Sequence, residues 1–113
     1  MKAIRPVELE TLLESDQPVE ILDIRPRRQF QDAHIEGAHS LPLAEVSPAS
    51  VLLSRELLPT EPLYFVSQSG AMAQLSACEL ERQGLDNLIV VAGGMHAWQR
   101  DGFPVVASDS WDG

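Results

Sequence analysis

Residues 62–73 read PLYFVSQSGAMA and predict a short buried strand, a loop of small residues and the first turn of a helix. The apolar run before the loop contains aromatic and β-branched side chains, as expected of a strand that is covered on both faces. The helix predicted over 71–83 ends at Gly84, because glycine adopts the left-handed conformation of a C-terminal cap without strain. In open parallel sheets ligands bind where a strand turns into a helix, so the loop at 67–72 is the first candidate for a site.

The rest of the chain alternates strand and helix patterns in the same way. We expect helices at 6–14, 26–33 (a single turn), 48–58 and 94–101, and strands at 19–24, within 34–43 and at 87–91. Ser47 is the predicted N-cap of the third of these helices, and Pro59 is expected to end it. The alternation favours one α/β domain over 1–113, an open parallel sheet with helices on both faces. Its core is expected over about 6–105, followed by a C-terminal tail at 106–113.

The charge and composition exclude several classes of function. The 113 residues include 17 acidic and 8 basic ones, a formal net charge of −9 that repels nucleic-acid phosphates and anionic lipid, so neither is an expected partner. No apolar run approaches about 20 residues, and no apolar signal segment follows residues 1–6, so we expect no membrane span and a cytoplasmic location. The single cysteine, Cys78, excludes a site of several thiolates, and no H-E-x-x-H or C-x-x-C motif occurs. We therefore expect no metal and no cofactor.

The loop has the composition of an anion cradle. Small side chains let successive backbone N–H groups converge, and the helix that follows adds partial positive charge at its N-terminus. The residues of this expected anion-binding loop are Ser67, Gln68, Ser69, Gly70, Ala71 and Met72. None of them is basic, so a small anion would depend on backbone donors.

Two longer motifs point to a known family. Residues 22–43, LDIRPRRQFQDAHIEGAHSLPL, resemble the first signature of rhodanese-like domains, and residues 93–105, GGMHAWQRDGFPV, are similar to the second. The resemblance implies a five-stranded parallel sheet flanked by helices and, in active members, transfer of sulfane sulfur from thiosulfate to cyanide or another thiophile. It also implies a structural role for eight signature residues: Asp23, Arg25, His34, Gly37, Ala38, Gly93, Gly94 and Trp98.

The resemblance also implies that the two catalytic side chains are absent. Active members place a cysteine first in the loop and usually an arginine five positions later, and these positions correspond to Ser67 and Met72. A serine hydroxyl stays protonated without a dedicated base and cannot hold a persulfide, whereas a thiol can be tuned to a thiolate. Methionine removes a fixed positive charge that helps to hold thiosulfate. We expect a protein without sulfurtransferase activity that acts as a binding or regulatory module for a protein partner.

Three other functions stay open. The chain could assist sulfur transfer with the thiol of a partner, position an active sulfur-carrier protein, or use Ser67 to hydrolyse an anionic ester. Hydrolysis needs a base within hydrogen-bond reach, and the loop lacks the G-x-S-x-G motif of serine hydrolases. Among the three histidines, His34 and His39 are expected to be structural and His96 to lie at the surface.

Several residues outside the loop also have predicted roles. The buried face of the helix after the loop is expected to comprise Ala73, Ala77, Leu80 and Gly84. At about 100° per residue, Cys78 lies roughly 130° from the centre of that face, which indicates an exposed structural thiol, with a redox or dimer contact as the alternative. We expect a local ion pair between Asp23 and Arg25 and a core position for Trp98. Trp111, in the tail, has no predicted partner and is a candidate contact of an interaction surface.

Overall fold

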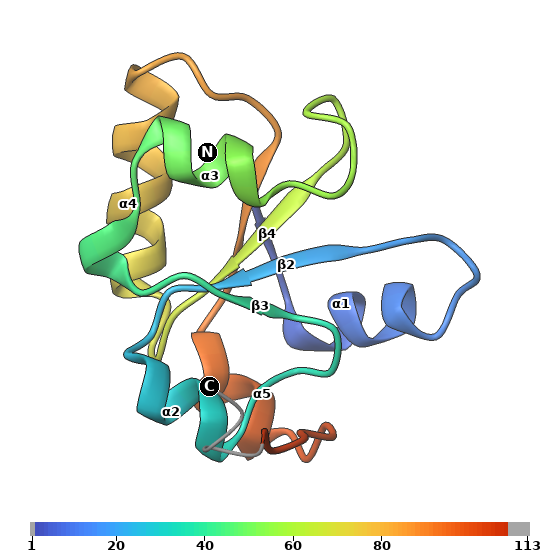
Figure 1. Cartoon of the computed structure of the whole chain (residues 1–113). Coiled ribbons are helices and arrows are strands. Elements are labelled where there is room, and N and C mark those ends of the chain that lie inside the picture. The colour runs from blue at the N-terminus through green and yellow to red at the C-terminus, as the bar shows by residue number, and fades with distance from the viewer. Residues whose placement is uncertain (1, 109–113) are drawn as a thin grey trace.

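Five strands form one parallel sheet in the order β1-β5-β4-β2-β3 in the computed structural model, which describes residues 2–108 (Figure 1). The strands are β1 Lys2–Ile4, β2 Glu20–Asp23, β3 His39–Ser40, β4 Leu63–Val66 and β5 Leu88–Val91. Each neighbouring pair is parallel, so the carboxyl ends of all strands lie at the same edge of the sheet. The predicted five-stranded parallel α/β architecture is confirmed.

Helices cover both faces of the sheet. They are α1 Pro6–Leu13, α2 Arg27–Asp32, α3 Pro48–Ser54, α4 Ala71–Arg82 and α5 Gly94–Arg100, with a 3-10 turn η1 at Leu43–Glu45. Alternate side chains of β4 point to opposite faces: Phe65 packs in one apolar cluster with residues of α3 and α4, and Val66 in another with residues of α1 and α5. Because both faces are covered, the central strands are apolar along their whole length.

Trp98 of α5 anchors the second of these clusters. Its side chain is buried and packs against Phe103, with ring centroids 5.1 Å apart. Its indole Nε1 donates a hydrogen bond to the carbonyl oxygen of Pro104 at 2.9 Å. A buried indole needs such an acceptor, and the predicted core position of Trp98 is confirmed.

Helix α4 ends as its sequence predicts. Gly84 has φ +101°, and the N–H groups of Gly84 and Leu85 donate to the carbonyls of Glu81 and Leu80, both at 3.0 Å. This is the hydrogen-bond pattern of a Schellman cap. The buried side chains of the helix are Ala73, Ala77 and Leu80. Gly84 lies beyond the helix and is exposed, so its predicted place on the buried face is wrong, whereas Cys78 is exposed as predicted.

Helix α3 is shorter than the sequence predicts. Ser47 caps it, since its Oγ accepts a hydrogen bond from the Ser50 N–H at 3.0 Å. The helix ends at Ser54, four residues before the predicted end, so Pro59 is not what stops it. The physical reason is tertiary: the Arg55 side chain turns to the buried carboxylate of Glu20, and it also donates to two carbonyl groups of the following loop.

The packed part of the chain extends past the expected core at 6–105. Strand β1 precedes it and pairs with β5, with Ile4 opposite Val91. At the other end, the backbones of His34 and Val106 exchange hydrogen bonds of 2.9 and 2.8 Å. Trp111 lies outside the described residues. Within residues 2–108, no helix has the length and apolar character that a membrane crossing requires.

Candidate functional site

The loop between β4 and α4 lies at the carboxyl edge of the sheet, flanked by the strands β2 and β5. Its last residue, Gly70, has φ +95° and forms the N-cap of α4. A Cβ atom at Gly70 would approach the backbone nitrogen of Gly93 to 3.0 Å. Both the positive φ and this close approach require glycine, so the turn into α4 is fixed by the sequence.

Ser67, the first residue of the loop, is buried with 3% of its surface exposed. Its Oγ accepts hydrogen bonds from the N–H groups of Gly70 at 3.0 Å and Ala73 at 3.2 Å. The hydroxyl therefore supplies an acceptor to two backbone donors at the start of α4, as an N-cap side chain does. One of the amide donors predicted for an external anion, that of Gly70, is therefore already used by the protein.

The N-terminus of α5 holds the loop from the opposite side. The N–H of Met95 donates to the Ser67 carbonyl, and the N–H of His96 donates to the Gln68 carbonyl, both at 2.9 Å. A Cβ atom at Gly94 would lie 2.2 Å from the Ser67 carbonyl oxygen, so only glycine permits this contact. The glycine pair of the second motif thus brings a helix terminus against the loop backbone.

Four other N–H groups of the loop remain available to a ligand. The amides of Gln68, Ser69, Ala71 and Met72 donate to no acceptor within residues 2–108. Gln68 and Ser69 are exposed, so this part of the loop is accessible from solvent. Such donors suit a small anion.

The first motif builds a buried ion pair beside the loop. The Arg25 guanidinium contacts both carboxylate oxygens of Asp23, with Nη2 at 2.8 Å from Oδ2 and Nε at 3.0 Å from Oδ1. Nη2 also donates to the carbonyl oxygen of Ala33 at 2.6 Å. The predicted local ion pair is confirmed, and it joins the end of β2 to the end of α2.

Other residues of that motif support the connection from α2 to β3. The buried ring of His34 stacks on Phe30, with centroids 3.9 Å apart, and its Nδ1 donates to the Phe30 carbonyl at 2.7 Å. Gly37 has φ +88° and Ala38 is partly buried in the second apolar cluster. These contacts place the motif in the scaffold, away from direct contact with the loop hydroxyl.

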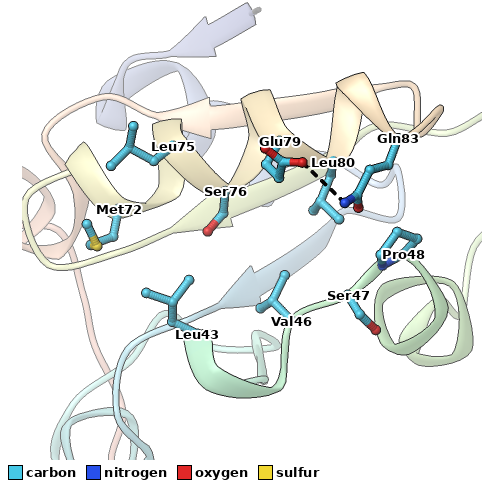
Figure 2. Close-up of a pocket in the computed structure, with 10 residues that line it drawn as sticks. All are labelled: Leu43, Val46, Ser47, Pro48, Met72, Leu75, Ser76, Glu79, Leu80 and Gln83. Carbon is cyan, nitrogen blue, oxygen red and sulfur yellow. Dashed lines mark hydrogen bonds between the residues drawn. The ribbon is translucent and has the colours of Figure 1, made fainter.

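An apolar groove of about 450 Å³ runs beside the loop between α4 and the segment from η1 to the start of α3 (Figure 2). Its apolar lining comprises Leu43, Val46, Pro48, Met72, Leu75 and Leu80. Met72 is 45% exposed and Leu75 63% exposed, and Figure 2 shows Met72 on the side of α4 that faces Leu43. No motif predicted this groove; the available signal was the apolar pair Met72 and Leu75, spaced i and i+3 outside the predicted buried face of α4.

Burial changes the titration of one side chain in β4. Tyr64 is buried, and desolvation raises the pKa of its phenol above the ordinary value.

His96 lies on the surface of α5, as predicted, and no histidine or carboxylate within residues 2–108 hydrogen-bonds to the Ser67 hydroxyl. The loop thus combines a buried neutral hydroxyl with open backbone donors.

Comparison with known proteins assigns the family. The profile of the rhodanese-like domain matches residues 5–101, which is most of the chain. The chain belongs to the rhodanese-like domain family. The solved structure of a rhodanese-like domain protein from Staphylococcus aureus superposes on this domain with a TM-score of 0.77 at 28% identity, covering 96% of this chain and all of that one.

Two relatives of known name show the range of proteins that contain this rhodanese-like domain. YrkF of Bacillus subtilis (strain 168), a candidate sulfur carrier protein, is 31% identical over 86 residues, which are 76% of this chain and 44% of YrkF. The thiosulfate sulfurtransferase GlpE of Vibrio cholerae is 28% identical over 99 residues, 88% of this chain and 89% of GlpE. The matched part of the chain covers about half or less of the length of the first three relatives that it matches: 44%, 55% and 22%. It is related both to sulfurtransferases and to a candidate sulfur carrier.

Proposed function

We propose that this rhodanese-like domain carries no sulfane sulfur on its loop and acts as a binding module for a protein partner. The observation that carries the proposal is the Ser67 hydroxyl, buried and held by the N–H groups of Gly70 and Ala73. By resemblance to the family, this is the position of the cysteine that bears the persulfide. A hydroxyl cannot replace that thiolate, because it has no base to remove its proton and its ordinary pKa lies far above that of a thiol.

The same contacts count against an esterase reaction at Ser67. A serine nucleophile is activated by a base within hydrogen-bond reach. Here the hydroxyl accepts two backbone hydrogen bonds, and within residues 2–108 it has no imidazole or carboxylate partner. The backbone N–H of His96 contacts the loop, but the His96 side chain is exposed to solvent. We therefore place Ser67 in the structure of the loop and not in catalysis.

Met72 supports binding in place of transfer. By resemblance it occupies the position of the arginine that helps to hold thiosulfate, and its exposed thioether instead lines the apolar groove beside Leu43 and Leu75. An apolar edge favours the side chains of a protein segment over a sulfur oxyanion. The exchange converts the edge of the former site into part of a protein-binding groove.

The partner that we propose is a protein that itself carries the sulfur. The names of two relatives, a candidate sulfur carrier protein and a thiosulfate sulfurtransferase, support a place in sulfur transfer. In that role the domain positions the carrier in the apolar groove, while the open amides at Gln68, Ser69, Ala71 and Met72 bind a small anion. A cytoplasmic location is part of the proposal, since the single exposed cysteine suits a reducing compartment.

A turnover assay tests the proposal. Purified protein is mixed with thiosulfate and cyanide, and the formation of thiocyanate is followed against a reaction without protein. We expect no rate above that background. A protein-dependent rate that Ser67→Ala abolishes would refute the structural role of Ser67, and a rate that Cys78→Ser abolishes would assign sulfur transfer to the helix thiol instead.

A further inference from the structure

We propose that Glu20, His39 and Glu56 form a binding site for a divalent transition metal ion. One ligand atom from each residue, an imidazole nitrogen and two carboxylate oxygens, lies within 4.8 Å of the other two. Glu20 begins β2, His39 begins β3 and Glu56 follows the end of α3. The site therefore lies toward the amino ends of the strands, at the opposite edge of the sheet from the loop at 67–70.

The strand register explains why these residues meet. His39 pairs with Leu22, and in β2 Glu20 lies two residues before Leu22, so all three side chains are on the same face of the sheet. This is the face that α3 covers, and the chain leaves α3 at Arg55, which brings Glu56 to the edge of the same surface. No local motif predicts the cluster, since its members are separated by 19 and 17 positions.

The donor set selects the class of metal. One imidazole and two carboxylates suit Zn²⁺ and related first-row ions, which accept mixed nitrogen and oxygen ligands at about 2.0–2.2 Å. Ca²⁺ and Mg²⁺ prefer ligands made entirely of oxygen. Three protein ligands leave a fourth tetrahedral position for water or for a ligand of a partner.

Two neighbouring groups orient the buried carboxylate. Only 4% of the Glu20 side chain is exposed, its Oε1 accepts from Arg55 Nε at 2.6 Å, and its Oε2 accepts from the Glu56 N–H at 2.5 Å. Each carboxylate oxygen keeps a second lone pair that can face a metal. Arg55 and the Glu56 amide thus play the part that outer hydrogen bonds play for metal-bound carboxylates.

The local charge still favours a cation. Two carboxylates contribute −2 and the Arg55 guanidinium +1, which leaves −1 before a neutral imidazole is counted. The other two ligands are also able to move, since Glu56 is 72% exposed and His39 is in part open to solvent. His39 Nε2 now lies 2.5 Å from Glu56 Oε1, and this contact opens by a small displacement when a metal enters between them.

A bound metal would join three segments of the fold. It ties the edge strand β3 to the chain that follows α3, in addition to the backbone pairing of β3 with β2 and the ion pair of Arg55 and Glu20. A ligand that binds only the folded state raises the free energy of unfolding. We therefore expect metal-dependent stabilisation of this edge of the sheet.

The test measures ZnSO4 binding to the untagged protein by isothermal titration calorimetry and by the midpoint of thermal unfolding. We expect one Zn²⁺ per chain and a higher midpoint for the wild type. His39→Ala and Glu56→Gln should each weaken binding by at least about tenfold, the loss that even outer contacts of a metal cause. Glu20 is left unchanged, because its removal would leave the buried Arg55 charge without its partner.

Two matched controls make the result decisive. His96→Ala removes an exposed histidine of α5, and Cys78→Ser removes the exposed thiol of α4, so neither should change Zn²⁺ affinity or stoichiometry. The inference is overturned if the wild type binds no Zn²⁺, or if His39→Ala and Glu56→Gln bind as the wild type does. Loss of binding in either control would likewise overturn it, by assigning the ion to another site.

Discussion

Replacing Ser67 with alanine removes the oxygen that accepts two backbone hydrogen bonds in the loop, while keeping the Cβ atom and the backbone contacts to α5. Each net hydrogen bond contributes about 0.5–1.5 kcal/mol, and loss of a serine N-cap costs about 0.5–2 kcal/mol. Ala73 is fully buried and Gly70 is buried, so water replaces the lost acceptor poorly. We expect the free energy of unfolding to fall by about 1–3 kcal/mol.

Urea unfolding followed by circular dichroism measures this loss. With an m-value of about 2 kcal/mol per M, the midpoint should fall by roughly 0.5–1.5 M while the m-value stays unchanged. Ser69→Ala is the matched control, because Ser69 is exposed and its side chain has no hydrogen-bond partner within residues 2–108. It should change the free energy of unfolding by less than about 0.5 kcal/mol. If Ser67→Ala unfolds at the same urea concentration as the control, the Ser67 hydroxyl does not hold the loop and the reasoning fails.

Three further predictions concern the chemistry of the loop and the scaffold. Ser67→Cys should accept the outer sulfur atom of thiosulfate but bind thiosulfate weakly. Adding Met72→Arg should improve the affinity for thiosulfate by roughly ten- to a hundredfold, which corresponds to a charge-assisted hydrogen bond of about 1.5–3 kcal/mol. No gain of activity in a folded double variant would show that the loop differs by more than two side chains. Tyr64, the only tyrosine, should ionise above its ordinary pKa of about 10 in an ultraviolet titration. The folded state holds the phenol proton more tightly than the unfolded state. The contribution of Tyr64 to stability is therefore complete below its pKa in the unfolded state and is lost as the pH rises through its pKa in the folded state, so Tyr64→Phe should lose less stability at high pH than the wild type. Ionisation of Tyr64 at the ordinary pKa would contradict this prediction. Arg25→Met should destabilise the protein by about 3–5 kcal/mol in urea unfolding by leaving the Asp23 charge buried and unpaired, and a loss below about 1 kcal/mol would refute that pairing role.

The order of elements was predictable from the sequence because local signals agree with the tertiary structure. The apolar run of β4, the small residues after it and the cap at Gly84 each specify one conformation of the backbone. The resemblance to a known family supplied the number of strands. Strand β1 escaped prediction because Lys2–Ile4 is too short to show a period.

The contacts between distant segments were not predictable in the same way. Glu20 and Asp23 stand out in the sequence as polar residues in an apolar strand, and each is half of a buried ion pair. The partner of Asp23 is two residues away and was predicted, whereas the partner of Glu20, Arg55, is 35 positions away and ends α3 early. Tertiary contacts of this kind override local helix propensity.

At the candidate site, too, local features were predictable and contacts between segments were not. The composition of the loop predicts converging N–H groups, but the contact of the Ser67 hydroxyl with two of them depends on the turn geometry at Gly70. The apolar groove beside Met72 also requires η1 to lie against α4, which no periodicity in the sequence shows. The residues that form the site could therefore be predicted from the sequence, whereas their contacts with other segments could not.

The central claim, that the loop of this rhodanese-like domain takes up no sulfane sulfur, is tested most directly by intact-protein mass spectrometry after incubation with thiosulfate. We expect the wild type and Cys78→Ser to keep their mass, and Ser67→Cys in the Cys78→Ser background to gain the mass of one sulfur atom. A stoichiometric gain of one sulfur by both the wild type and Cys78→Ser, removed by cyanide as thiocyanate, would contradict the claim, whereas a gain shown by the wild type alone would assign the sulfur to Cys78.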